Sequence, residues 1–155
     1  MAVPRSDVHR RGMRPTGYTL LETMAALALL CVVLGIALPP VARWRDDAAV
    51  RAARDEIAAE LAAARMAAVA RGGAGLVVDP VTGRVWVVSG AGRAGEAIDV
   101  AGRYGVRLRV GPGGPVLIAY DALGIGRLGS RTIEVRRGRA AGGLTVSAYG
   151  RVRRW

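Results

Sequence analysis

The stretch from Gly17 to Pro40 reads GYTLLETMAALALLCVVLGIALPP and is apolar or small at nearly every position. A helix of the twenty-one residues 18–38 would be about 31 Å long, which matches the hydrocarbon thickness of a bilayer. One charge, Glu22, interrupts the run near its start. An unpaired carboxylate inside a membrane helix costs about 2.5 kcal/mol or more and usually marks a functional contact. The stretch therefore predicts a single-pass membrane helix that carries a functional carboxylate.

Two simpler interpretations account for less of this stretch. A cleaved secretory signal has a shorter apolar core followed by a small-residue cleavage site. Here the run is longer, and Pro39 and Pro40 stand where cleavage would fall. A plain membrane anchor explains the length of the run but leaves Gly17 and Glu22 unexplained.

The order Gly17, Tyr18, Thr19, Leu20, Glu22 resembles the start of type IV pilins and of type II secretion pseudopilins. Those proteins have a basic leader, a glycine before the cleavage point and a glutamate as fifth mature residue. The resemblance implies that a prepilin peptidase cleaves between Gly17 and Tyr18 and methylates the new amine of Tyr18. It also implies that Glu22 meets the charged N-terminus of a neighbouring subunit during filament assembly. The usual first mature residue is phenylalanine, so Tyr18 is a departure that bears on the efficiency of processing.

The basic leader, residues 1–17, sets the expected orientation. Its four arginines precede the apolar run, which keeps this end cytoplasmic and sends the C-terminal domain outward. The resemblance places that domain in the periplasm, with the helix in the inner membrane and an assembly platform and other pilins or pseudopilins as partners. We expect four segments: a leader (1–17), a transmembrane or filament-core helix (18–38), its amphipathic continuation (39–72) and an extracytoplasmic β-rich domain (73–155).

Residues 41–72 are alanine-rich, contain no proline and end in a glycine pair, which favours a helix with a defined stop. Their apolar residues recur every three or four positions and form one stripe. The stripe comprises Val50, Ala53, Ile57, Leu61, Ala64 and Ala68. Pro39 and Pro40 remove backbone donors and are expected to kink the helix without ending it. Two separate helices, or a heptad coiled coil with weak alanine-rich core positions, are the alternatives.

From residue 76 the period changes to two, which is typical of strands. Predicted strands cover 76–79, 84–89, 105–110, 116–120, 132–136 and 144–149, with 151–155 as a tail or last strand. The first two flank the turn sequence at 80–83 and form a hairpin. Several short strands after one long helix predict an α+β, pilin-like fold, with an antiparallel sheet packed on the apolar stripe. The glycine-rich segments 90–104 and 121–131 are predicted to be long loops.

The sequence offers no catalytic, metal-binding or cofactor-binding pattern. His9 is the only histidine and would leave with the leader, and Cys31, the only cysteine, lies within the apolar run. Scattered acids suggest no acid–base pair, no zinc spacing is present, and no calcium site is proposed by the loop acids. Two G-x-G-x-x-G matches, at 90–95 and 124–129, lack the following helix that a dinucleotide fingerprint needs. We expect no cofactor and no enzymatic activity.

Arginine provides the remaining signal, because residues 73–155 carry thirteen arginines against five acidic residues. Clustered arginines attract nucleic acid without reading its sequence, although solubility alone would also account for them. The candidate DNA-binding residues are Arg136, Arg137, Arg151, Arg153 and Arg154, with Arg139 beside the first pair.

The closing pattern Ser147-x-x-Gly150-Arg151-x-Arg153, after the N-terminal motif and long helix, resembles the GspH/FimT family. That family contains the H-type minor pseudopilin of type II secretion and minor pilins linked to DNA uptake. In the DNA-uptake branch the closing G-R-x-R is associated with DNA contact, which would carry over to Arg151 and Arg153. The sequence therefore predicts a minor pseudopilin for protein secretion, with a DNA-binding minor pilin as the alternative.

Overall fold

The structure is a computed structural model that describes residues 18–90, 92–111, 113–127 and 129–155, without the side chains of residues 37–40. It divides into two compact units, Met1–Leu38 and Pro39–Trp155. Helix α1 spans Leu20–Arg71, so the predicted helix from about residue 18 to about residue 71 is confirmed. The helix continues through Pro39 and Pro40, as predicted. The predicted kink at these prolines lies at the boundary between the two units and stays a prediction. The leader and Gly17 lie outside the described residues.

The predicted apolar stripe of α1 is buried in the second unit. Val50, Ala53, Ile57, Leu61, Ala64 and Ala68 are each at most 4% exposed. Alanine at three of these six positions has little side-chain volume, which lets the helix backbone approach the strands closely. Gly72 follows the helix with a positive φ of 79°, a conformation that stops a helix at little cost for glycine.

The described residues after α1 form nine strands and a short second helix. In chain order they are β1 (Gly73–Asp79), β2 (Arg84–Ser89), β3 (Gly92–Arg93), β4 (Ile98–Asp99), α2 (Val100–Tyr104), β5 (Arg107–Val110), β6 (Val116–Asp121), β7 (Arg131–Arg137), β8 (Ala140–Val146) and β9 (Val152–Arg154). One sheet has the order β3-β2-β1-β6, with β4 also paired to β2, and the other has the order β5-β7-β8-β9. Every strand pairing between described residues is antiparallel.

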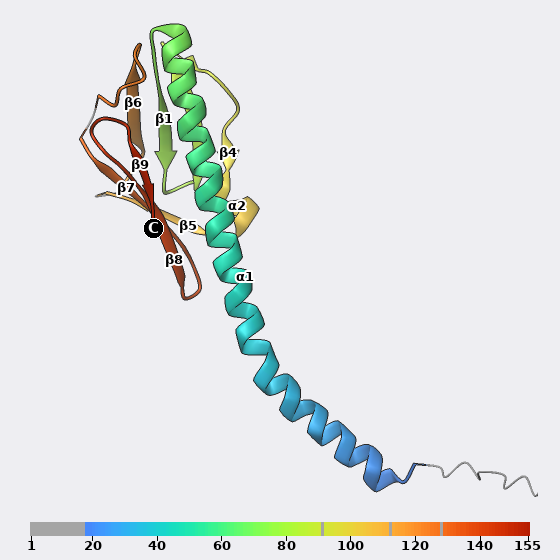
Figure 1. Cartoon of the computed structure of the whole chain (residues 1–155). Coiled ribbons are helices and arrows are strands. Elements are labelled where there is room, and N and C mark those ends of the chain that lie inside the picture. The colour runs from blue at the N-terminus through green and yellow to red at the C-terminus, as the bar shows by residue number, and fades with distance from the viewer. Residues whose placement is uncertain (1–17, 91, 112, 128) are drawn as a thin grey trace, which may run out of the picture. The chain divides into compact units, whose positions relative to one another are not determined.

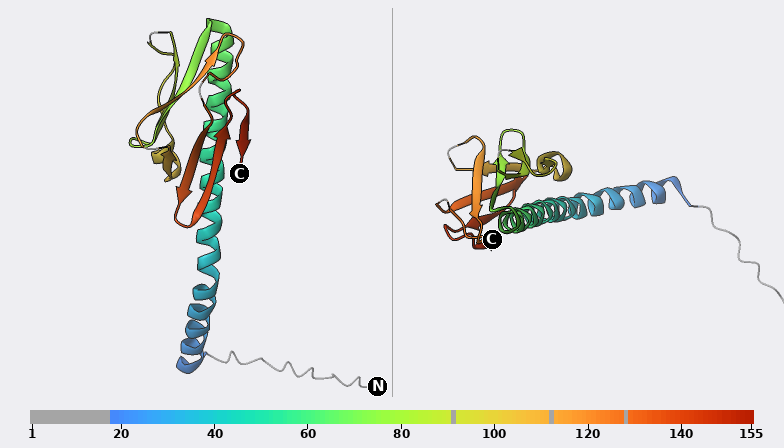
Figure 2. Two further views of the ribbon diagram at one scale, coloured as in Figure 1. Left: turned by 90° about the vertical axis from the view of Figure 1, so that its left-hand side faces the viewer. Right: turned by 90° about the horizontal axis from the view of Figure 1, so that it is seen from above.

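The core of the second unit lies between the second half of α1 and the two sheets, which run alongside that half in Figures 1 and 2. The largest fully buried side chains come from the helix and from both sheets. They include Ile57, Leu61, Leu76, Val78, Val85, Ile133, Val135 and Leu144. This arrangement confirms the predicted α+β, pilin-like class, with antiparallel strands packed on the stripe.

Two predictions about the strands are wrong in detail. The segment 90–104 was predicted to be a long loop but contains β3, β4 and α2. Strands β3 and β4 pair with β2. Helix α2 forms where Asp99 accepts a hydrogen bond from the Gly102 N–H and caps the helix. Strand β8 covers Ala140–Val146 and not 144–149. The run Ala140–Gly143 has low strand propensity, but its pairing with β7 places it in the sheet.

Candidate functional site

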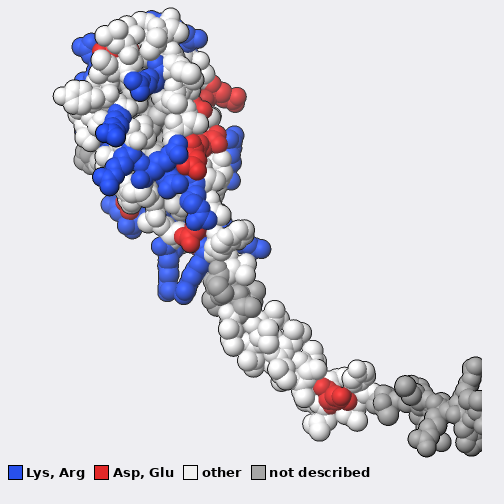
Figure 3. Space-filling model, in the orientation of Figure 1, with Lys and Arg blue, Asp and Glu red and all other residues white. Residues whose placement is uncertain are grey.

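The first candidate site is the assembly segment, residues Tyr18–Ile36 of the first unit. Every residue in it is exposed; Leu20 is 80% and Ile36 73% exposed. Figure 3 shows this half of the helix almost free of charge, with one acidic residue near its start. The helix that contains this segment is long and apolar enough to span a membrane. An apolar helix face of this size needs lipid or other helices around it.

The start of the assembly segment is capped by Thr19. The Thr19 hydroxyl oxygen accepts a hydrogen bond from the Glu22 N–H at 3.2 Å, and the Thr19 carbonyl accepts another from it at 3.1 Å. Threonine followed three residues later by glutamate is the capping-box pattern. The sequence interpretation overlooked this pattern, in which the Thr19 side chain caps the helix start through the backbone N–H of Glu22.

The closing pattern forms a turn that presents its arginines. The Ser147 carbonyl accepts a hydrogen bond from the Gly150 N–H at 2.9 Å, and the Ser147 hydroxyl accepts one from the Arg151 N–H at 3.0 Å. Gly150 has φ 82°, and a Cβ on it would lie 2.8 Å from the Tyr120 ring. These contacts explain why serine and glycine stand at these two positions. They direct the chain into β9, where it pairs with β8.

The second candidate site is the C-terminal arginine groove, a hollow of about 640 Å³ between α1 and β9. Its basic lining residues are Arg65, Arg151, Arg153 and Arg154. All four are exposed, and none of the described residues that line the groove is acidic. Tyr120 forms part of its floor, and burial raises the pKa of this phenol above its usual value, so the ring adds no negative charge near pH 7. The groove can therefore attract an anion.

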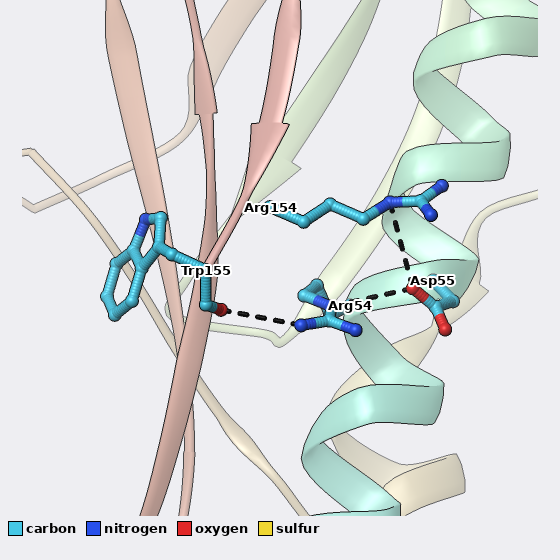
Figure 4. A network of polar contacts seen from close by, with 4 residues as sticks. All are labelled: Arg54, Asp55, Arg154 and Trp155. Carbon is cyan, nitrogen blue, oxygen red and sulfur yellow. Dashed lines mark hydrogen bonds and ion pairs between the residues drawn. The ribbon is translucent and has the colours of Figure 1, made fainter.

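The arginines of this groove differ in whether an acidic side chain lies close to them. Figure 4 shows Arg154 turned toward α1, where its Nε lies 3.8 Å from a carboxylate oxygen of Asp55. Arg54 bridges the same carboxylate at 3.4 Å and donates a hydrogen bond to the Trp155 carbonyl at 3.4 Å. Among the described residues, Arg151 and Arg153 have no acidic partner within 4 Å. The pair named from the closing pattern is thus the more available one.

The structure does not bring Arg136 and Arg137 into the C-terminal arginine groove. They line a separate groove beside β5. Arg137 holds the fold together: its Nε lies 3.0 Å from Asp46 on α1, and its Nη1 donates to the Tyr104 carbonyl at 2.6 Å. Arg136 pairs with Glu134 on its own strand, and Arg139 follows in the β7–β8 turn.

Glu56 joins α1 to α2, which the sequence interpretation did not foresee. Its two carboxylate oxygens accept hydrogen bonds from Arg103 at 2.8 Å and from the Tyr104 hydroxyl at 2.7 Å. The hydrogen bond to Glu56 raises the pKa of Tyr104 above its usual value. No sequence spacing links residues 48 positions apart, so only the fold reveals this contact.

Comparison with known proteins gives two findings. Residues 13–38 match the model of the prokaryotic N-terminal methylation motif. The crystal structure of the type IV minor pilin FimU of Pseudomonas aeruginosa is similar to the chain with a TM-score of 0.54. That match has 16% identity and covers 68% of this chain and 87% of the FimU chain. The chain has a type IV pilin fold. No curated protein gives a significant match.

The pilin-like fold and the methylation motif together support the type IV pilin and pseudopilin superfamily predicted from the sequence. The motif match covers Gly17, Tyr18 and Glu22, on which the resemblance rested. Within the part of the chain that is described, no group of three or more metal-ligating side chains comes together.

Proposed function

We propose that this protein is a minor pseudopilin of a type II secretion system, a structural subunit of a periplasmic pseudopilus. The observation that carries the proposal is the assembly segment: an exposed apolar helix that begins with the methylation motif and continues into a folded domain. Before assembly, the segment anchors the chain in the inner membrane, with residues 1–17 in the cytoplasm and residues 73–155 in the periplasm. During assembly, it leaves the lipid for the filament core.

In this proposal each motif residue has one role. A prepilin peptidase cleaves between Gly17 and Tyr18 and methylates Tyr18. Glu22 pairs with the charged N-terminus of the next subunit and sets axial register, because a slip would leave both charges unpaired. Pro39 and Pro40 kink the helix between its filament-core half and its domain half. The assembly platform and the other pseudopilins are the partners.

Processing gives the first test. We expect the chain purified from membranes to begin at Tyr18 with one N-methyl group, because the peptidase is proposed to cleave the bond between Gly17 and Tyr18. Intact-mass spectrometry and N-terminal peptide sequencing measure this. Gly17→Arg is expected to leave the chain at full length, whereas Gly12→Arg, a matched change inside the leader, leaves cleavage unaffected. An unprocessed wild-type chain would reduce the protein to a plain membrane anchor.

A second candidate function, a minor pilin that binds DNA for uptake, is favoured by the C-terminal arginine groove. The exposed side chains of Arg151 and Arg153 lack acidic partners within 4 Å among the described residues, and the groove has no acidic lining. Arginine side chains in this state bind phosphates through charge-assisted hydrogen bonds and release counterions from DNA. Arg154 contributes less, since Asp55 lies beside it.

DNA titration separates the two candidates. For the DNA-uptake function we expect duplex affinity that falls steeply between 50 and 200 mM salt, conditions in which phosphate contacts weaken. The slope of log affinity against log salt concentration measures the number of phosphate contacts. Arg151→Ala/Arg153→Ala is expected to reduce the magnitude of this slope by about 2, one for each lost contact. Arg107→Ala/Arg109→Ala removes the same charge from another face and should retain the slope. Absent binding, or binding indifferent to Arg151 and Arg153, keeps the secretion pseudopilin as the function.

A further inference from the structure

A second groove, distinct from both candidate sites, runs along β5. It has a volume of about 880 Å³ and is bounded by the β1–β2 turn, by β5 and by the end of β7. A shallower hollow of about 510 Å³ shares Pro80, Val81, Leu108 and Arg109 with it and extends toward Gly114. We call the two together the β5 groove. Its described lining residues include Arg107, Arg109, Arg136 and Arg137, and none of them is acidic.

The charges of the β5 groove are only partly neutralised. Arg137 is held by Asp46, and Arg136 pairs with Glu134. The exposed side chains of Arg107 and Arg109 have no acidic partner within 4 Å among the described residues. In the β5–β7 pairing Arg107 stands directly opposite Arg136, an arrangement of like charges that destabilises a sheet. Arg109 stands opposite Glu134, whose carboxylate is already engaged by Arg136. An anion bound here would relieve the repulsion between Arg107 and Arg136.

The position of β5 at the edge of its sheet favours an extended peptide as the anionic ligand. Among the described residues β5 pairs with β7 alone and is therefore an edge strand, whose other side has no strand partner and offers hydrogen-bonding groups to an added strand. Leu108 and Val110 are buried, whereas Arg107 and Arg109 alternate with them on the outer face. A partner strand in register would meet the two guanidinium groups with residues two positions apart.

The β1–β2 turn supplies an apolar contact on the other side of the groove. Val81 is 81% exposed at the tip of this turn, which is held in shape by hydrogen bonds from the Val81 and Thr82 N–H groups to Asp79. These hydrogen bonds, together with one from the Thr82 hydroxyl, keep the pKa of the Asp79 carboxyl below its usual value. The turn is therefore a preformed wall beside the arginines.

From these observations we infer that the β5 groove binds an extended acidic segment of another protein, with acidic residues at alternate positions that pair with Arg107 and Arg109. The segment adds to the β5 edge through backbone hydrogen bonds. A second copy of this chain does not fit, because its twelve acidic residues include no two that are separated by a single residue. The site uses no residue of the assembly segment or of the C-terminal arginine groove, so it does not depend on the proposed function.

A binding experiment uses the full chain in detergent micelles and a fluorescent peptide of alternating glutamate and threonine, with a glutamine–threonine peptide as its neutral match. We expect anisotropy to show binding of the acidic peptide only. Arg107→Ala/Arg109→Ala should weaken it about tenfold or more, as expected when two charge-assisted contacts are lost. Arg45→Ala/Arg127→Ala changes two exposed arginines that line neither groove, makes the same change in net charge and should leave the affinity unchanged.

Hydrogen exchange supplies the second measurement, because strand addition protects backbone amides. We expect the amides of residues 107–110 to exchange more slowly with the acidic peptide bound. Equal weakening in both double variants would show nonspecific attraction to a basic protein and overturn the proposal. Tighter binding of single-stranded DNA to the same groove would also overturn it. A third result would overturn the proposal: the wild type does not bind the peptide, and the Arg107→Ala/Arg109→Ala variant self-associates. The arginines would then serve only to prevent the β5 edge from pairing with another copy of the chain.

Discussion

Replacing Leu61 by alanine is expected to lower the free energy of unfolding of the second unit by about 2–5 kcal/mol, as large-to-small changes in a core do. Leu61 is 1% exposed and belongs to the cluster that joins α1 to both sheets. Its neighbours on the stripe, Ile57 and Ala64, are fully buried. Since the adjacent stripe residues include alanines, no long side chain on the helix can fill the cavity. Urea unfolding of residues 39–155, followed by circular dichroism, measures the change.

The matched control is Met66→Ala on the same helix. Met66 is 67% exposed, so its truncation creates no cavity and should change stability by no more than about 0.5 kcal/mol. In a domain of this size each kcal/mol corresponds to a shift of roughly 4 °C in Tm. Equal losses in the two variants would mean that burial of Leu61 against the sheets does not determine the effect, since helix propensity alone favours alanine at both positions.

The helix was predictable because its signals are local. Apolar residues at three- and four-residue steps identified the buried stripe from Val50 to Ala68, and the glycine pair at 72–73 marked its end. The hairpin of β1 and β2 was equally readable from alternation on either side of a turn sequence. In both cases the residues that make the contacts lie close together in the sequence.

The division into two sheets could not be read from the sequence. β1 pairs with β6, more than thirty residues away, and no periodicity within either strand names its partner. β8 begins four residues before the predicted strand, since pairing with β7 outweighs the low strand propensity of two alanines and two glycines. Gly143 also exchanges backbone hydrogen bonds with Trp155, a contact made possible only by the chain's return through β9.

The candidate sites divide in the same way. The residues of the methylation motif are contiguous, so sequence alone located Gly17, Tyr18 and Glu22, and the motif match covers them. The closing pattern and the clustering of arginines identified the candidate residues, but not which of them have an acidic partner. The fold places Arg151 and Arg153 in one groove, and it ties Arg137 to Asp46 at another. Whether an arginine is available depends on an acidic neighbour distant in sequence, which composition does not reveal.

Glu22→Gln is expected to reduce incorporation of the subunit into filaments about tenfold or more while leaving processing intact. Glutamine keeps the size of the side chain, and the hydrogen bond to the Thr19 hydroxyl uses the backbone N–H of residue 22, so the helix start is preserved. It removes the charge that would pair with the N-terminal amine of a neighbour, and a buried amine left unpaired costs several kcal/mol. The fraction of subunit in sheared filaments, compared with the fraction in membranes, measures the effect.

Thr19→Ala is the control that separates the effect of the helix cap from the effect of the Glu22 charge. It removes the hydroxyl that caps the Glu22 N–H, at a cost of about 1 kcal/mol of helix stability, and leaves the carboxylate in place. If charge pairing sets the register, Thr19→Ala still enters filaments and Glu22→Gln does not. If Glu22→Gln assembles normally while Thr19→Ala does not, the capped start of the helix is what assembly needs, and the pairing role of Glu22 is wrong.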